Sequence, residues 1–409
     1  MQRSAHGLWS NRAFRVFWFG QTVSLLGDSF AFVALPLLVF QATGSATQMA
    51  LVASTSWMGP FVACLSSGGI SDRGNPRRLM LGSELGRMCA YLFLALGWWR
   101  IGPHMWIVYI ATAVGGYLGG ITHVAHTTIV ANLVGSDQLI AANSRLQTSA
   151  ATSFLLGPAL AGHLCAFAGA PVAVAANAAS FAVSALMVAS IRLPFSAPTI
   201  DPPRAAESAE GWRGASAGLR FLIAHPVLRP LTALMVLSTF WAAASTELFV
   251  FALKRHPMVG DATIGFVMSV AAGGAVLAGL ATPMARRHFG LGTTFVGSMV
   301  GTGAAFGLAG AADSPAAMTV AAVAAGFCQA TRMILLISSR QELTPRHLLG
   351  RATSAHLALY FGVIALGTAV MGLIARGIGA PTTLMLMGGI MTICAIGGAL
   401  NPAWRRQLD

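Results

Sequence analysis

Long apolar segments, separated by short polar connections, follow one another along the whole of the 409-residue chain. Each segment is close to the ~20 residues that an α-helix needs to cross the ~30 Å hydrocarbon core of a bilayer. The pattern predicts an all-α membrane protein. Its twelve expected transmembrane helices lie at residues 14–38, 48–69, 79–99, 105–125, 145–166, 171–191, 230–252, 262–284, 291–311, 316–338, 353–375 and 382–400.

Lysine and arginine are unevenly distributed over the connections between these segments. Of the 25 basic residues, nineteen lie in the two termini and every second connection, four lie in the remaining connections, and two lie inside spans. Because basic residues are retained on the cytoplasmic side, both termini are predicted to be cytoplasmic in a multi-pass protein of the bacterial cytoplasmic (inner) membrane. This distribution accounts for the net charge of +13 without nucleic acid as a partner.

The longest connection lies in the middle of the chain, at residues 194–229. Its first part is rich in Pro, Ala and Ser, as flexible linkers are. Its second part, residues 212–224, carries spaced apolar residues and is predicted to be a short amphipathic helix on the cytoplasmic surface. The chain is therefore expected to comprise an N-terminal six-helix bundle (1–193), this cytoplasmic linker (194–229) and a C-terminal six-helix bundle (230–409).

The two bundles carry a weak internal repeat. A shift of 210 residues without gaps places Gly157 on Gly367 and Gly162 on Gly372. Two pseudo-symmetric six-helix halves are the architecture of secondary transporters in which one half rocks against the other around a central site.

The composition excludes several other classes. The chain is 56% hydrophobic and 9% charged, far from the composition of a soluble domain. Its single lysine, Lys254, is followed by Arg255, so no Gly-Lys-Ser/Thr phosphate loop exists and an internal ATPase motor is excluded. The five cysteines lack metal-site spacing, and no cluster of catalytic side chains stands out, so the sequence predicts no cofactor, no metal site and no enzyme.

A short polar run joins the second and third expected spans. It contains Gly68, Asp72, Arg73, Arg77 and Arg78. Small residues allow close helix approach, and the carboxylate of Asp72 can accept hydrogen bonds from a helix N-terminus or an arginine. We interpret the run as a gating loop that latches two moving bundles; the alternative is a plain positively charged cytoplasmic loop.

The fifth expected span contains Gly157, Pro158 and Gly162. The proline frees a backbone carbonyl and bends the helix, and the glycines allow close crossing of a neighbour. Ordinary helix packing explains these residues equally well.

These two motifs resemble those of the major facilitator superfamily. Gly68-x-x-x-Asp72-Arg73 followed by Arg77-Arg78 is similar to its signature loop between helices 2 and 3, although Asn75 and Pro76 depart from the usual pattern. Gly157-Pro158-Ala159-Leu160-Ala161-Gly162 is similar to the helix-5 motif of its antiporting exporters, with Ala161 in place of a glycine. The resemblance implies the two-bundle fold of that superfamily.

Further motifs, in order along nearly the whole chain, resemble the branch of macrolide-efflux and enterobactin-exporter-like proteins. They are Gly27-Asp28 with Ala34-Leu35-Pro36, Asn132-Leu133-Val134 with Leu139 and Ala142-Asn143-Ser144, Gly218-Leu219-Arg220-Phe221 with His225-Pro226, and Gln341-Glu342-Leu343-x-Pro345 with Gly350-Arg351. The helix-4 arginine common in drug exporters is missing, and this region offers only His123 and His126.

Three acids fall inside expected spans, where an ionisable group is costly and points to function. Asp28 is expected near mid-membrane, where it binds a proton or a cationic substrate or, alternatively, has a structural hydrogen-bonding role. Glu84 and Arg87 are three residues apart on one helix face and can pair with each other, as a structural ion pair or, alternatively, in proton coupling. Glu247 is expected to pair with Lys254 or Arg255, in proton coupling or in outer gating.

Two further residues complete the expected cavity. Arg332 is expected to hold an anionic substrate or to lower the pKa of a nearby acid. The alternative is that its side chain only extends to the lipid headgroups. His123 titrates in the physiological range, unless it is simply packed or hydrated.

Together these features predict a monomeric secondary active transporter in contact with membrane lipids. Its partners are expected to be protons and a small amphipathic molecule, drug-like or a siderophore or other secondary metabolite, exported by proton antiport with alternating access. A lipid or lysolipid flippase of the same fold is the alternative, and a polytopic membrane enzyme is disfavoured.

Overall fold

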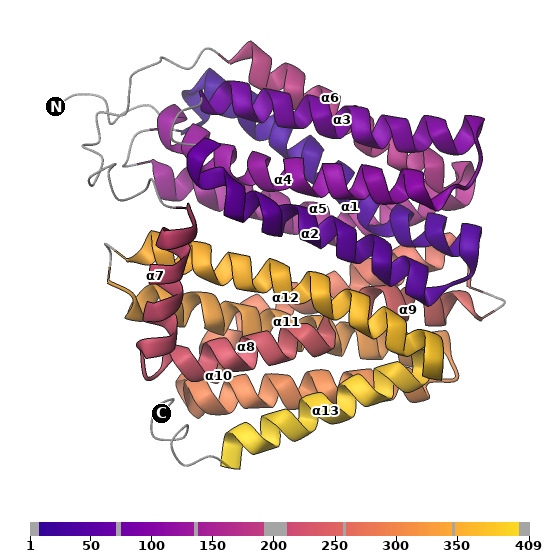
Figure 1. Cartoon of the computed structure of the whole chain (residues 1–409), viewed down its shortest axis with the longest axis vertical. Helices are drawn as coiled ribbons and strands as arrows, with labels where there is room; N and C mark the ends of the chain where they lie inside the picture. Colours follow the sequence, from indigo (N-terminus) through magenta and orange to yellow (C-terminus); the bar gives the residue numbers. More distant parts are fainter. Residues whose placement is uncertain are drawn as a thin grey trace. The chain divides into compact units, whose positions relative to one another are not determined.

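The computed structural model describes residues 8–70, 75–134, 138–191, 211–256, 259–345 and 348–400. Within these ranges the chain is helical, without strands (Figure 1). A 3-10 turn at Leu8–Ser10 is followed by α1 (Arg12–Thr43), α2 (Ala46–Ile70), α3 (Pro76–Arg100), α4 (Met105–Leu133), α5 (Leu139–Ala168), α6 (Ala170–Ser190), α7 (Gly211–Ala224), α8 (Leu228–Ala242), α9 (Ser245–Lys254), α10 (Asp261–Ala311), α11 (Pro315–Leu343), α12 (Leu349–Ile378) and α13 (Ala380–Leu400).

In this part of the chain, eleven helical segments are long and apolar enough to cross a membrane. One of them, Leu228–Lys254, is made of α8 and α9. Another, α10, has 51 residues and contains Gly290 at a φ of 80°, a left-handed conformation that breaks the helix. Counting α10 as two spans on either side of Gly290 gives the twelve that hydropathy predicts, so the predicted fold class is confirmed.

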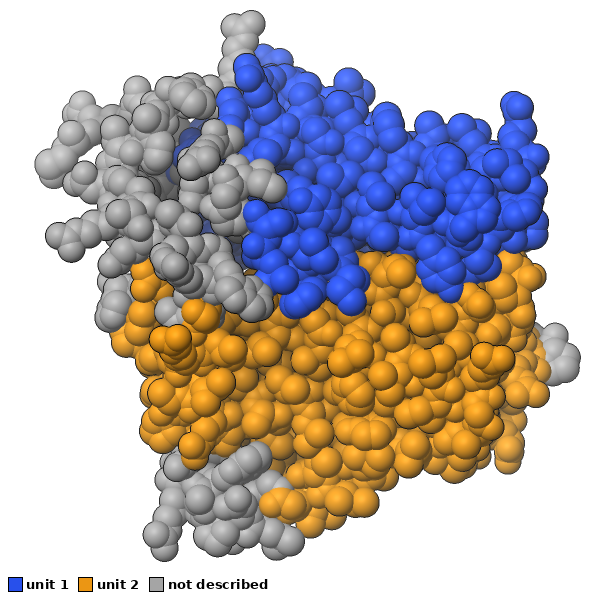
Figure 2. Space-filling model, viewed as in Figure 1, with its two compact units in different colours: residues 1–35, 58–214 blue, residues 36–57, 215–409 orange. Residues whose placement is uncertain are grey.

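The chain forms two compact units (Figure 2). Unit 1 comprises Met1–Leu35 and Met58–Gly214, and unit 2 comprises Pro36–Trp57 and Ala215–Asp409. The predicted division into bundles at 1–193 and 230–409 stays a prediction. In the structure, the end of α1 and the start of α2 belong to the same compact unit as the C-terminal helices.

Hydrogen bonds explain why residues 36–57 belong to unit 2. The Thr47 hydroxyl donates to the carbonyl oxygen of Gly372 at 2.7 Å. About two turns along α2, the Ser54 hydroxyl donates to the carbonyl oxygen of Ala365, also at 2.7 Å. The Trp57 ring then stacks on Phe361, with centroids 6.1 Å apart. The first part of α2 therefore lies along α12.

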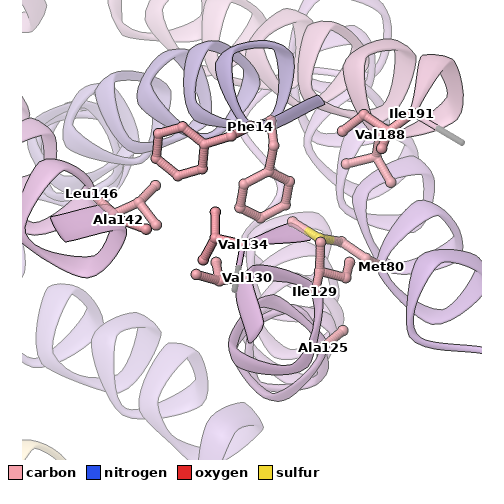
Figure 3. Packing of buried hydrophobic residues seen from close by; sticks show 11 residues of the cluster. Phe14, Met80, Ala125, Ile129, Val130, Val134, Ala142, Leu146, Val188 and Ile191 are labelled. Carbon is pink, nitrogen blue, oxygen red and sulfur yellow. The ribbon is translucent and has the colours of Figure 1, made fainter. Parts of the chain in front are cut away.

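The ends of five helices of unit 1 meet in one apolar cluster (Figure 3). Phe14 and Phe17, both fully buried, extend from the start of α1 into this cluster. Their partners are Met80 of α3, Ala125, Ile129 and Val130 of α4, Val134 at the C-terminal end of α4, Ala142 and Leu146 of α5, and Val188 and Ile191 at the end of α6. This packing fixes α1, α3 and α6 relative to one another, and these three helices carry the polar cluster described below.

The short helix predicted at residues 212–224 is present as α7 (Figure 1). Its Leu222 packs with Leu228, Ala352 and Ala355, so one face of α7 lies against the first turns of α12. Ile223, one of the apolar residues of this helix, is half exposed.

Candidate functional site

An ion pair lies inside unit 1, between α1 and α3. Arg87 Nη2 donates to Asp28 Oδ1 at 2.6 Å. The arginine side chain is only 11% exposed, whereas that of Asp28 is 33% exposed. Asp28 is therefore the member of the pair that solvent or a ligand can reach.

A second carboxylate stands one helical turn from the arginine on α3. Glu84 is fully buried. Its Oε1 accepts a hydrogen bond from the Ser184 hydroxyl of α6 at 3.1 Å, and that hydroxyl accepts one from Gln21 Nε2 of α1 at 3.0 Å. Glu84 Oε2 has no hydrogen-bond partner. A buried carboxylate oxygen without a donor is costly in its charged form.

Close helix packing holds these groups together. A Cβ atom on Gly27 would lie 1.9 Å from Ser180 Oγ, so only glycine lets α1 approach α6 at the residue before Asp28. On the other side, the guanidinium carbon of Arg87 lies 4.0 Å from the ring centroid of Phe181, a cation–π contact. Tyr91, one turn further along α3, packs edge-on against the same ring.

Gly157 of the helix-5 motif packs closely against α1 at Ser29, the residue after Asp28. A Cβ atom on Gly157 of α5 would lie 2.3 Å from Ser29 Cβ of α1. The Ser29 hydroxyl donates to the carbonyl oxygen of Ser153 at 3.0 Å. Since Ser29 follows Asp28 directly, the crossing of α5 over α1 fixes the backbone that carries the carboxylate. Pro158 and Gly162 lie on α5 beyond this crossing.

Asp28, Glu84 and Arg87 form the acid–base centre of unit 1. With both carboxyls ionised the three side chains carry a formal charge of minus one, and one added proton makes them neutral. In a low-dielectric interior, a net charge is far more costly than a neutral set of hydrogen-bonded groups. This arrangement can take up and release one proton.

Two predicted pairings are wrong. The carboxylate bonded to Arg87 is Asp28 rather than Glu84, because the packing of α1 on α3 brings Asp28 to the guanidinium. Glu247 pairs with neither predicted partner: the ammonium group of Lys254 bonds Asp261 at the start of α10, and Arg255 is exposed. Gln41 of α1 also donates to Asp261, at 3.3 Å.

The remaining cavity candidates lie elsewhere. Glu247 is buried in α9, and its Oε2 has no hydrogen-bond partner. Arg332 is buried in α11 and donates from Nη1 to the Thr302 hydroxyl at 3.2 Å. His123 is exposed on α4, so it is not part of the acid–base centre.

Only part of the predicted gating loop can be placed. Asp72 and Arg73 fall outside the described residues, and Gly68 lies in the last turn of α2. Arg77 Nε donates to the carbonyl oxygen of Val188 at 3.1 Å, and its Nη2 to that of Ala189. These carbonyls end α6, so Arg77 caps that helix. Arg78 is exposed.

The sequence interpretation missed the α6 side of the centre. Asn177, Ser180 and Ser184 are buried on one face of an otherwise apolar helix. Their spacing of three and four residues is the available signal, because polar residues that recur at helical spacing face another helix or a polar interior rather than lipid. Gln21 of α1 belongs to the same network.

Comparison with known proteins agrees with this geometry. The family profile described as transmembrane secretion effector matches residues 4–403. The chain belongs to this family. It is thus a transporter of the major facilitator superfamily, an exporter by type and a multi-pass membrane protein, not an enzyme.

Relatives of this secretion effector include the enterobactin exporters EntS of Shigella boydii and of Escherichia coli. Each is 24% identical over 371 residues, which cover 91% of this chain and 86% of the relative. Among solved structures, the nucleoside transporter NupG matches with a TM-score of 0.73 at 13% identity, covering 94% of this chain and 98% of that one. A bacterial homologue of the iron transporter ferroportin matches with a TM-score of 0.64 at 16% identity, covering 95% and 99%. These two likenesses show the fold alone.

Proposed function

We propose that this secretion effector exports a small amphipathic molecule across the bacterial inner membrane by proton antiport with alternating access. The observation that carries the proposal is the centre formed by Asp28, Glu84 and Arg87. It contains one more carboxyl than basic group, and it is buried in helices that span the membrane. An exporter without a phosphate-binding loop must draw its energy from an ion gradient.

The two carboxyls have different roles in this proposal. Asp28, one-third exposed, exchanges the proton with water or competes with the substrate for Arg87. Glu84, fully buried and hydrogen-bonded to Ser184, sets the charge that Arg87 experiences when Asp28 is neutral. Protonation of Asp28 weakens its bond to Arg87, since a charge-assisted hydrogen bond becomes a weaker one.

The substrate class is inferred from the relatives. Two of them are named enterobactin exporters, which supports a siderophore or a similar secreted metabolite over other cargo. At 24% identity the pocket side chains are free to differ, so a drug-like amphipathic compound is the second class within the same proposal.

The deciding experiment uses the purified protein in liposomes, with substrate flux measured with and without an imposed pH gradient. We expect flux against a substrate gradient only when the pH gradient is present. Asp28→Asn is expected to abolish this active flux while substrate exchange continues, because the amide imitates the protonated acid. Asp313→Asn, in an exposed connection between α10 and α11, is the matched control and is expected to transport normally.

Two results would contradict the proposal. Pumping by Asp28→Asn at the parental rate would make Asp28 structural. A parental protein that ignores the pH gradient would exclude antiport and favour a facilitator or a flippase of the same fold.

A further inference from the structure

Unit 2 contains two buried arginines on one face of α11. Arg332 and Arg340 are 6% and 7% exposed. They are eight residues apart in a continuous helix, which places them on the same face about 12 Å apart along its axis. Buried arginines are normally paired with carboxylates, because an uncompensated charge away from water is costly.

No described carboxylate of unit 2 pairs with either arginine. Glu342 accepts from Arg286 at 2.6 Å, and Asp261 pairs with Lys254. Asp313 lies at the opposite end of α11 from Arg340, and Glu247 is buried in α9 without a basic partner. Arg332 donates to the Thr302 hydroxyl.

Around Arg340, several hydrogen-bonding groups are buried and unused. Arg340 Nε and Nη1, Ser339 Oγ and Thr344 Oγ1 all lack a hydrogen-bond partner. Ser339 is fully buried and Thr344 is 6% exposed. Four such atoms lie within six consecutive residues: two guanidinium nitrogens that can only donate and two hydroxyls that are free to donate.

Helix α12 adds no negative group to these arginines. On α12, His356 is buried and lies within electrostatic reach of Arg340, and Tyr360, one turn further, lies within electrostatic reach of Arg332. The N-terminus of α12, which begins at Leu349, adds the partial positive charge of a helix start. Arg340 near the end of α11 could in principle serve only to offset the helix dipole, but its Nε and Nη1 donate to no carbonyl.

We infer that Arg340, Ser339, Thr344 and His356 form a binding site for an oxyanion, a carboxylate or phosphate group, and that Arg332 extends this site along α11. An oxyanion satisfies the orphaned donors and neutralises the buried charge of Arg340, and Arg332 adds a second positive charge further along the helix. Two sources share this chemistry, a soluble organic or inorganic anion and the phosphate of an anionic lipid. The inference concerns binding and does not depend on proton antiport.

The test measures thermal unfolding of the purified full-length protein in uncharged detergent, titrated with sodium benzoate or sodium phosphate against sodium chloride at matched ionic strength. We expect saturable stabilisation by benzoate or phosphate beyond that by chloride. Arg340→Gln is expected to raise the half-saturating concentration about tenfold or more, the effect of losing a charge-assisted hydrogen bond. Arg376→Gln, at an exposed arginine of α12, is the matched control and is expected to bind as the parent does.

A second arm distinguishes the lipid source. The parent, Arg340→Gln and Arg376→Gln are unfolded in nanodiscs of phosphatidylcholine, with and without phosphatidylglycerol. Stabilisation by phosphatidylglycerol that Arg340→Gln loses, with no effect of soluble anions, assigns the site to a lipid headgroup. If the parent and Arg340→Gln respond identically in both arms, the site does not exist.

Should Arg340→Gln fail to fold, the milder variants Ser339→Ala and Thr344→Val carry the same test. Each removes one orphaned hydroxyl with little change in volume, so each is expected to weaken anion binding while the protein remains folded. Unchanged half-saturating concentrations in both variants would overturn the assignment.

Discussion

At the scale of single residues, Arg87 joins several groups of unit 1. It bonds Asp28, lies over the Phe181 ring and stands one turn from Glu84. The sequence identified all three charged residues, because ionisable groups are rare within apolar spans. It could not identify the pairing, because Glu84 is near Arg87 along the helix whereas Asp28 meets it only when α1 packs on α3.

The ion pair between Arg87 and Asp28 leads to a prediction for stability. Arg87→Gln leaves two carboxyls without a positive partner and is expected to lower the free energy of unfolding by about 3 kcal/mol, at the low end for a buried pair because Asp28 is partly exposed. The double variant Arg87→Gln with Asp28→Asn is expected to regain most of that loss. Thermal unfolding in detergent over the four-member cycle measures the coupling. Additive losses would show that the pair contributes nothing specific.

At the scale of helices, hydropathy predicted the spans because each requires only a long apolar run. The contacts that position the helices depend on individual small residues, which hydropathy does not detect. Gly290 breaks α10 between two expected spans. The close crossing at Gly157 brings the helix-5 motif against Ser29, the residue after Asp28. The packing of residues 36–57 with unit 2 likewise arises from contacts between distant segments, such as that of Thr47 with Gly372.

Substitution of Gly157 tests the role of this crossing. In Gly157→Ala the new Cβ would lie 2.3 Å from Ser29 Cβ, so α5 or α1 must shift. We expect a loss of about 1–3 kcal/mol in the free energy of unfolding, together with reduced transport, because Asp28 moves with Ser29. Gly82→Ala is the matched control. Nothing lies within 4 Å of a Cβ there, so it is expected to be neutral or slightly stabilising. Equal behaviour of the two variants would remove the crossing from the mechanism.

At the scale of the whole molecule, the distribution of arginines predicts the orientation in the membrane. In a variant without the five native cysteines, Ala205→Cys in the central linker is expected to resist a membrane-impermeant maleimide added from outside. His104→Cys, exposed between α3 and α4, is expected to react. Labelling of intact cells followed by mass spectrometry measures both, and the reverse pattern would invert the topology.

The contact between α2 and α12 makes the last prediction. Alternating access requires the helices of the first half of the chain to separate from those of the second half on one side of the membrane in each cycle. The bonds from Thr47 to Gly372 and from Ser54 to Ala365 join these halves within unit 2, so they are expected to break during transport. Cysteines at Ser54 and Ala365, joined by a short bifunctional reagent in a variant without native cysteines, should therefore stop flux while the protein stays folded.

Each single-cysteine variant, treated in the same way, is expected to keep its flux. A reagent that can be cleaved by reduction should restore transport. Full flux through the cross-linked protein would mean that α2 and α12 move together throughout the cycle, and the opening would then have to occur at other helices.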